Sequence, residues 1–118
     1  MNRQTTQSDY AAFLDRKSQI GSNDGFEPLW IPDFLYDFQK HLVDWSIRKG
    51  KSALIEDCGL GKTPQELVWA ENVRRHTNKP VLLLSPIAVS QQMVREGEKF
   101  GIEVKRSIDG TVHPNITT

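Results

Sequence analysis

Short apolar runs alternate with helix-like segments between residues 52 and 108, and this alternation constrains the fold more than any other feature. Ser52–Ile55 and Val81–Leu84 are apolar runs of strand length, and Ile102–Ile108 alternates between apolar and polar residues. Residues 62–77 and 88–100 lie between these runs and carry apolar residues at helical spacing. Strands separated by helices pair in parallel, with right-handed crossovers. The pattern therefore predicts an α/β fold with a mainly parallel sheet, in which Val81–Leu84 is buried on both faces.

The residues before this region predict two more helices. One covers residues 8–19, and the other covers residues 36–49 and stops at Gly50. Residues 21–25 form a turn or linker between them. We therefore divide the chain into an N-terminal helix with its linker, residues 1–25, and one domain over residues 26–118. The residues expected to face inward are Tyr10, Phe13 and Leu14, then Phe38, Leu42 and Trp45, then Leu67, Ala70 and Val73, and then Val89, Met93 and Phe100.

Composition excludes several classes of protein. The 118 residues suffice for one compact domain, and 37% hydrophobic residues suffice for a core. Fifteen basic and fifteen acidic residues balance, so there is no general attraction to DNA or membranes. Short basic groups would follow phosphates if they shared a face, but charge alone favours an ordinary solvated surface. A single cysteine, no signal-like start and no long apolar run predict a reduced, cytoplasmic protein without a membrane segment.

The segment Gly59-Leu60-Gly61-Lys62-Thr63 carries the strongest chemical signal. It follows an apolar run and precedes a helix, which is the context of a phosphate-binding loop. Glycines let successive backbone N–H groups point at phosphate oxygens, and the helix N-terminus adds a partial positive charge. Lys62 would reach the β- and γ-phosphates, and the Thr63 hydroxyl would bind Mg²⁺ carried by the nucleotide. The motif therefore predicts ATP and Mg²⁺ as ligands.

One position departs from the full phosphate-loop pattern. Glu56 stands where the motif has Gly or often Ala, so its carboxylate either faces away from the phosphates or repels them. Cys58 has no neighbouring His in sequence that would activate it, and we interpret it as a small filler inside the loop. The alternative is a chance match at an ordinary strand-to-helix turn, which the flanking patterns disfavour.

Residues 35–100 resemble the first motor domain of superfamily 2 helicases, and look most like the Swi/Snf-type translocases and related helicases of phages and prophages. The first block of this likeness runs from Leu35 to Gln39 (Leu-Tyr-Asp-Phe-Gln) and is followed by Trp45. It is similar to the family's adenine-recognition segment. An amide offers the donor and the acceptor that match N6 and N7 of adenine. The resemblance thus implies that Gln39 binds adenine, whereas alone it would be interpreted as a surface residue of an amphipathic helix.

Two further blocks follow in the family's order. Residues 57–63 (Asp-Cys-Gly-Leu-Gly-Lys-Thr) are similar to the family's acidic form of the Walker A loop, and residues 83–89 (Leu-Leu-Ser-Pro-Ile-Ala-Val) look like motif Ia. The resemblance implies contacts from Ser85, Pro86 and Ser90 to the backbone of DNA or RNA, although these residues alone equally describe a routine strand-to-helix turn. It also implies an incomplete three-layer, RecA-like domain over residues 26–118.

The residues that hydrolyse ATP in this family have no counterpart after the loop. The family uses an Asp-Glu pair (Walker B) on a later strand and an arginine finger from a second motor domain, and this chain contains neither. Catalysis of phosphoryl transfer consists mainly of positioning and electrostatic stabilisation. We therefore expect an ATP-binding N-terminal fragment of a nucleic-acid-dependent ATPase, which moves on DNA in its full-length form and is inactive alone.

Two other functions compete with this interpretation. A stand-alone, non-catalytic nucleotide- or DNA-binding module would modulate a full-length relative through the same surfaces. A small P-loop kinase would need a lid and catalytic arginines after the loop, and no adenine-binding Gln39 before it.

An incomplete sheet would also leave an open edge and uncovered apolar faces, which favours self-association.

Overall fold

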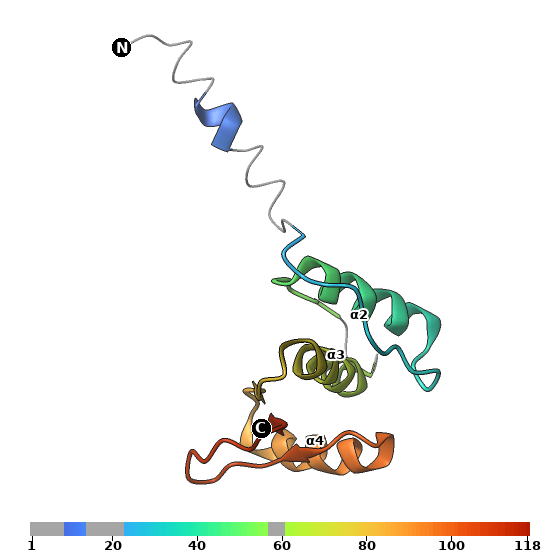
Figure 1. Cartoon of the computed structure of the whole chain (residues 1–118), viewed down its shortest axis with the longest axis vertical. Helices are drawn as coiled ribbons and strands as arrows, with labels where there is room; N and C mark the ends of the chain where they lie inside the picture. The colour runs from blue at the N-terminus through green and yellow to red at the C-terminus, as the bar shows by residue number, and fades with distance from the viewer. Residues whose placement is uncertain (1–8, 14–22, 57–60) are drawn as a thin grey trace.

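The computed structural model describes residues 9–13, 23–56 and 61–118. Figure 1 shows α3 lying between α2 and α4. Residues 9–13 are helical and fall inside the helix predicted over 8–19, the rest of which, with Leu14, lies outside the described residues. The principal elements are α2 (Asp37–Lys49), α3 (Lys62–Thr77), β1 (Val81–Leu82), α4 (Ile87–Phe100), β2 (Val104–Lys105) and β3 (Ile116–Thr117).

The three strands form one parallel sheet, in the order β1-β3-β2. The last strand in sequence therefore lies in the middle, with Ile116 aligned to Val81 on one side and to Val104 on the other. Helix α4 separates β1 from β2 as the alternating pattern predicted, and helices with a parallel sheet agree with the predicted α/β class. The predicted strand over residues 102–108 is shorter than expected, because ladder pairing covers only Val104 and Lys105.

Helices cover the sheet on one face. Val81, Val104 and Ile116 are buried beneath α3 and α4, which also pack on each other. Leu82 and Leu84 are 60% and 88% exposed. The prediction that residues 81–84 are buried on both faces is therefore wrong. Within the described residues the domain has two layers instead of three, since α2 packs on α3 and not on the strands.

Residues 52–55 do not form the strand that their composition predicted. The segment is irregular and exposed, and the Ile55 side chain keeps 97% of its surface in contact with solvent. A strand requires a neighbour that completes its backbone hydrogen bonds. No described strand runs beside residues 52–55, because β1 pairs only with β3. The apolar run therefore lacks the partner that strand formation needs.

Helix α2 has the predicted extent but buries a different face. Phe38 and Trp45 are 44% and 39% exposed. The buried side chains lie one position further along the chain, at the i, i+4, i+7, i+8 spacing of one helical face; they are Gln39, Val43, Ser46 and Ile47. The sequence pattern places aromatic residues inward by hydrophobicity alone. The observed rotation instead buries a polar side chain, which is stable because Gln39 has hydrogen-bond partners.

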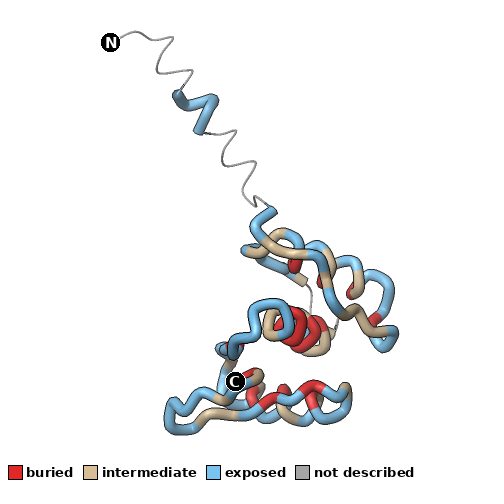
Figure 2. The backbone as a smooth tube through the Cα atoms, in the orientation of Figure 1, coloured by how far each residue is buried: buried red, intermediate tan, exposed pale blue. Residues whose placement is uncertain are grey.

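Helix α3 is the centre of the domain, and Figure 2 shows buried residues gathered along it. Leu67 and Ala70 are fully buried as predicted, and Val73 is half-buried against the core. Asn72 is also fully buried. Its Oδ1 accepts hydrogen bonds from the backbone N–H of Leu29 at 2.8 Å and of Trp30 at 2.9 Å. Its Nδ2 donates to the carbonyls of Trp30 at 2.7 Å and Val68 at 2.8 Å. One amide thus fixes the segment before α2 onto α3.

Helix α4 agrees with its predicted face. Met93 is buried, and Val89 and Phe100 are half-buried. Pro86 precedes the first helical residue, and Gly101 ends the helix in the left-handed conformation. Both signals are visible in the sequence. A proline disfavours the helical conformation at the residue before it, so the helix begins after Pro86. Glycine adopts a positive φ without a steric penalty, so the helix ends at Gly101.

The end of the predicted linker is held against α2. The backbone N–H groups of Asp24, Gly25 and Phe26 donate to the carbonyls of Lys49, Arg48 and Ile47, over 3.1 to 3.3 Å. These bonds satisfy carbonyls that a helix C-terminus otherwise leaves unpaired. A side chain at Gly25 would overlap the Ile47 carbonyl oxygen. Residues 24 and 25 therefore belong structurally with the domain that follows them.

Candidate nucleotide-binding site

The glycine loop meets α3 at Gly61. This residue has φ 71° and ψ 52°, the left-handed conformation, and Lys62 is the first residue of the helix. A residue with a Cβ is strained at these angles. A Cβ at Gly61 would also lie 2.5 Å from the Gln39 side-chain nitrogen. Gly61 is thus required both by its backbone angle and by the close approach of α2. Gly59 and Leu60, together with Asp57 and Cys58, lie outside the described residues.

Gln39 connects the start of α2 to this loop. The side chain is 3% exposed. Its Oε1 accepts a hydrogen bond from the Tyr36 backbone N–H at 2.9 Å, and its Nε2 donates to the Gly61 carbonyl at 3.3 Å. The start of α2 and the glycine loop, which the resemblance placed in one site, are therefore in contact through two residues that are 22 positions apart. In this arrangement both ends of the amide bond protein groups.

Lys62 and Thr63 stand in the first turn of α3. The Lys62 side chain is exposed and lies on the wall of a cleft, and Thr63 is half-buried. The first turn of a helix carries unpaired N–H groups and a partial positive charge. Lys62 is the one cationic side chain among the described residues that line the cleft.

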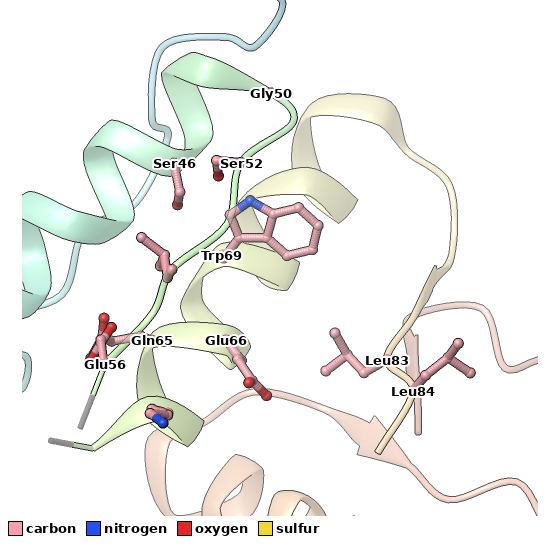
Figure 3. Close-up of a pocket in the computed structure, with 11 residues that line it drawn as sticks. Ser46, Gly50, Ser52, Glu56, Gln65, Glu66, Trp69, Leu83 and Leu84 are labelled. Carbon is pink, nitrogen blue, oxygen red and sulfur yellow. The ribbon is translucent and has the colours of Figure 1, made fainter. Parts of the chain in front are cut away.

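The cleft has a volume of about 340 Å³. Figure 3 shows residues 50–56 along one side, Leu83 and Leu84 on the other, and α3 between them. Glu66 and Trp69 of α3 project into the space. The cleft is therefore bounded by three separate parts of the chain.

The cleft also carries acidic groups near Lys62. Glu56, which departs from the phosphate-loop pattern, accepts a hydrogen bond from the Gln65 side chain at 2.9 Å. Gln65 also donates to the Gly61 carbonyl at 3.3 Å, so Glu56 and the loop are held by one residue. Burial raises the pKa of the Glu66 carboxyl, the charge of Lys62 lowers it, and the charge of Glu56 raises it, with a net upward shift. The anionic form of Glu66 is thus disfavoured in the cleft.

The predicted nucleic-acid contacts lie around the start of α4. Pro86 caps the helix, and the Ser85 hydroxyl shares a hydrogen bond with the Thr118 hydroxyl at 3.1 Å. Ser90 is 6% exposed, and its hydroxyl donates to the Ile87 carbonyl at 2.8 Å. The Ser90 hydroxyl therefore faces into the domain, away from a position where it would meet a phosphate. Ser85 is half-buried, and Pro86 is at the surface.

Neither a metal-binding cluster nor a membrane-spanning helix is found in the described ranges 9–13, 23–56 and 61–118. No group of three or more His, Cys, Asp or Glu side chains is arranged to hold a metal ion there. No helix in those ranges has the length and apolarity needed to cross a membrane.

Sequence reasoning missed the floor of the cleft. Gln65, Glu66 and Trp69 were not selected as site residues, although they line it together with Lys62. A signal was present, because Lys62 and Glu66 are four residues apart, as are Gln65 and Trp69, and such pairs share a helix face. What the sequence lacks is any indication that this face stays uncovered.

Comparisons of the chain with protein-family models, with curated proteins and with solved structures gave no match.

Proposed function

We propose that this chain is the ATP-binding part of a nucleic-acid-dependent ATPase of the superfamily 2 helicase and translocase type, with a RecA-like domain. One observation carries the proposal: a left-handed glycine directly precedes a helix that begins with Lys62 and Thr63. The Gln39 contact supports it, because a residue singled out for adenine recognition reaches Gly61. The parallel order of the strands is compatible with such a domain.

The residues of the site fit ATP better with Mg²⁺ than without it. The helix N-terminus and Lys62 favour the β- and γ-phosphates. Glu56 and Glu66 line the same cleft and disfavour a bare polyanion. Mg²⁺ would neutralise part of the phosphate charge, with the Thr63 hydroxyl as the protein's ligand. We therefore expect Mg-ATP to bind more tightly than ATP in the presence of a chelator.

Gln39 would bind the adenine of ATP, and the start of α4 would bind the nucleic acid. Gln39 would contact adenine while its bonds to Tyr36 and Gly61 hold the amide in position. Ser85 and Pro86 would contact the backbone of DNA or RNA. Ser90 would support this turn from inside through its bond to the Ile87 carbonyl. The chain lacks an Asp-Glu pair after the loop, so we expect binding of nucleotide without turnover.

Titration of the purified chain with Mg-ATP tests the proposal. Lys62→Ala removes a charged contact to phosphate and should weaken binding about tenfold or more. Lys79→Ala is the matched control, because Lys79 is exposed in the turn after α3, at the opposite end of that helix from Lys62. Saturable binding that both variants retain equally, or no binding by the wild-type chain, would contradict the proposal.

A phosphate-release assay tests the second part. We expect no steady-state hydrolysis of ATP above the buffer rate, with or without single- or double-stranded DNA. Sustained turnover that is lost in Lys62→Ala would show that the chain contains its own catalytic carboxylate, contrary to the expectation from its sequence.

A further inference from the structure

Two segments with unpaired backbone border the same cleft. On one side, residues 52–56 are exposed and irregular in spite of a strand-like composition. On the other side, β1 is an edge strand of the described sheet, since its only partner is β3. Leu54 and Glu56 line the cleft from the first segment, and Leu83 and Leu84 line it from the second (Figure 3).

The direction of the β1 backbone groups is fixed by its existing hydrogen bonds. The Val81 and Leu83 N–H groups donate to the carbonyls of Asn115 and Thr117, at 2.9 Å and 2.8 Å. Alternate residues of a strand direct their N–H and C=O groups to opposite edges. The N–H and C=O groups of Leu82 and Leu84 therefore point to the outer edge, beside the cleft. Backbone groups in such a row pair with another extended chain.

The shape of the cleft selects a single strand as its occupant. Residues 50–56 form its far wall, and the α3 side chains Glu66 and Trp69 form its floor. A second copy of the sheet would need to bring its own helices to the β1 edge, where residues 50–56 already stand. One extended peptide needs only the spacing of a strand between two neighbours.

We propose that this cleft binds an extended polypeptide segment by β-strand addition to the outer edge of β1. The segment would exchange backbone hydrogen bonds with Leu82 and Leu84, and residues 52–56 would pair with its other edge. Addition of a strand derives affinity from main-chain bonds and specificity from alternate side chains. On the side of α3, alternate residues of the segment would lie over Trp69, so apolar side chains are favoured there. Lys62 and Glu66 line the same cleft, so a bound segment and a bound nucleotide would compete there.

A fluorescence-anisotropy titration with a labelled synthetic peptide tests the proposal. The probe is a capped peptide of alternating Val and Thr with a Lys at each end. Two further peptides of the same side chains carry N-methyl groups on alternate residues, one along one edge and the other along the opposite edge. We expect the unmodified peptide to bind, and both N-methylated forms to bind about tenfold more weakly, because each loses ladder bonds on one edge. Equal binding of all three peptides would overturn strand addition.

Leu82→Pro tests the edge from the side of the protein. The substitution removes the outward N–H, and its ring obstructs an added strand, while the β1–β3 bonds use Val81 and Leu83. The matched control is Leu82→Ala, which shortens the side chain and keeps the N–H. We expect peptide binding about tenfold weaker in Leu82→Pro and changed less than threefold in Leu82→Ala. Equal loss in both variants would show that the leucine side chain, not the backbone edge, holds the peptide.

Two further measurements distinguish other outcomes. In Leu82→Pro we expect Mg-ATP binding to persist while peptide binding is weakened, so each proposal can fail separately. Sedimentation of the wild-type chain over a range of concentrations tests for a second copy as the occupant. Self-association that Leu82→Pro abolishes, without binding of the peptide, would replace the proposed occupant by another copy of this chain. If Leu82→Pro does not fold, the N-methylated peptides still decide the question.

Discussion

The contact of α3 with α2 and with the segment before α2 differs from the outer edge of β1 in how its polar groups are bonded. At the first, buried amides are paired on every side: Asn72 makes four hydrogen bonds, and Gln39 joins Tyr36 to Gly61. At the second, backbone groups and leucines of one strand face a cleft. The difference teaches that the chain pairs the buried amides of Gln39 and Asn72 and leaves backbone groups available at one edge. Substitutions should therefore cost most at the first region.

The largest effect is expected at Asn72. Asn72→Ala leaves two N–H groups and two carbonyls without this partner in a buried place, and should lower the free energy of unfolding by about 3 kcal/mol. Urea denaturation monitored by circular dichroism measures the change. Gln91→Ala is the control, because Gln91 is exposed on α4, and should change stability by about 0.5 kcal/mol or less. A loss below 1 kcal/mol at Asn72, on the order of a single exposed hydrogen bond, would contradict the fixing role of this amide.

An intermediate effect is expected at Gly61. Gly61→Ala should cost about 2 kcal/mol, from the left-handed backbone and from the overlap with the Gln39 amide. In a Gln39→Ala background the overlap is gone, so the same change should cost about 1 kcal/mol. The four chains of this double-mutant cycle are compared by urea denaturation. Additive costs would mean that Gln39 does not press on Gly61.

The smallest effects are expected from two glutamates of α3 whose pKa values move in opposite directions. Burial by itself would raise the pKa of Glu71, but hydrogen bonds from Arg74 and Arg75, with their charges, lower it below its ordinary value. This carboxylate therefore stabilises the fold above its unfolded pKa, and the contribution disappears as the pH falls through the lowered folded pKa. Glu71→Gln should lower stability by about 1 kcal/mol at pH 7.

Glu66 should behave in the reverse sense. Its pKa is raised, chiefly by burial in the cleft. Protonated Glu66 therefore favours the folded state below its unfolded pKa, and this contribution is lost as the pH rises through the folded pKa. Glu66→Gln should slightly increase stability at pH 7 and change little at pH 4. Thermal unfolding of both glutamine variants across this range checks the two signs, and equal signs would contradict the contrast between closed contact and open cleft.

The parts of the fold that could be predicted from the sequence depend on local signals. The bounds of α3 and α4 follow from Gly61, Pro86 and Gly101, each of which acts through its own backbone. The strand at residues 52–55 and the buried face of α2 could not be predicted. The first depends on whether another strand lies beside it, and the second on hydrogen bonds between Gln39 and residues far along the chain.

The candidate site shows the same division. The resemblance to helicases predicted that Gln39 and the glycine loop act together. In the structure, Gln39 forms a hydrogen bond with Gly61 of this loop. Trp69 and Glu66 were missed because helical spacing indicates a shared face without indicating whether that face is covered. Exposure of Leu82 and Leu84 was missed for a related reason, since an apolar run by itself favours burial on both sides.

The central position of β3 has a consequence for the order of events during synthesis. Strands β1 and β2 pair with Ile116 and Thr117 and not with each other. While a ribosome is still adding residues before position 116, both strands lack every ladder partner that they have in the finished sheet. The contact between α2 and α3 needs no residue beyond 77 and can form first. We expect the nascent chain to carry a paired helical unit with exposed apolar strands until residues 116 and 117 emerge, which is the interval in which a chaperone would bind it.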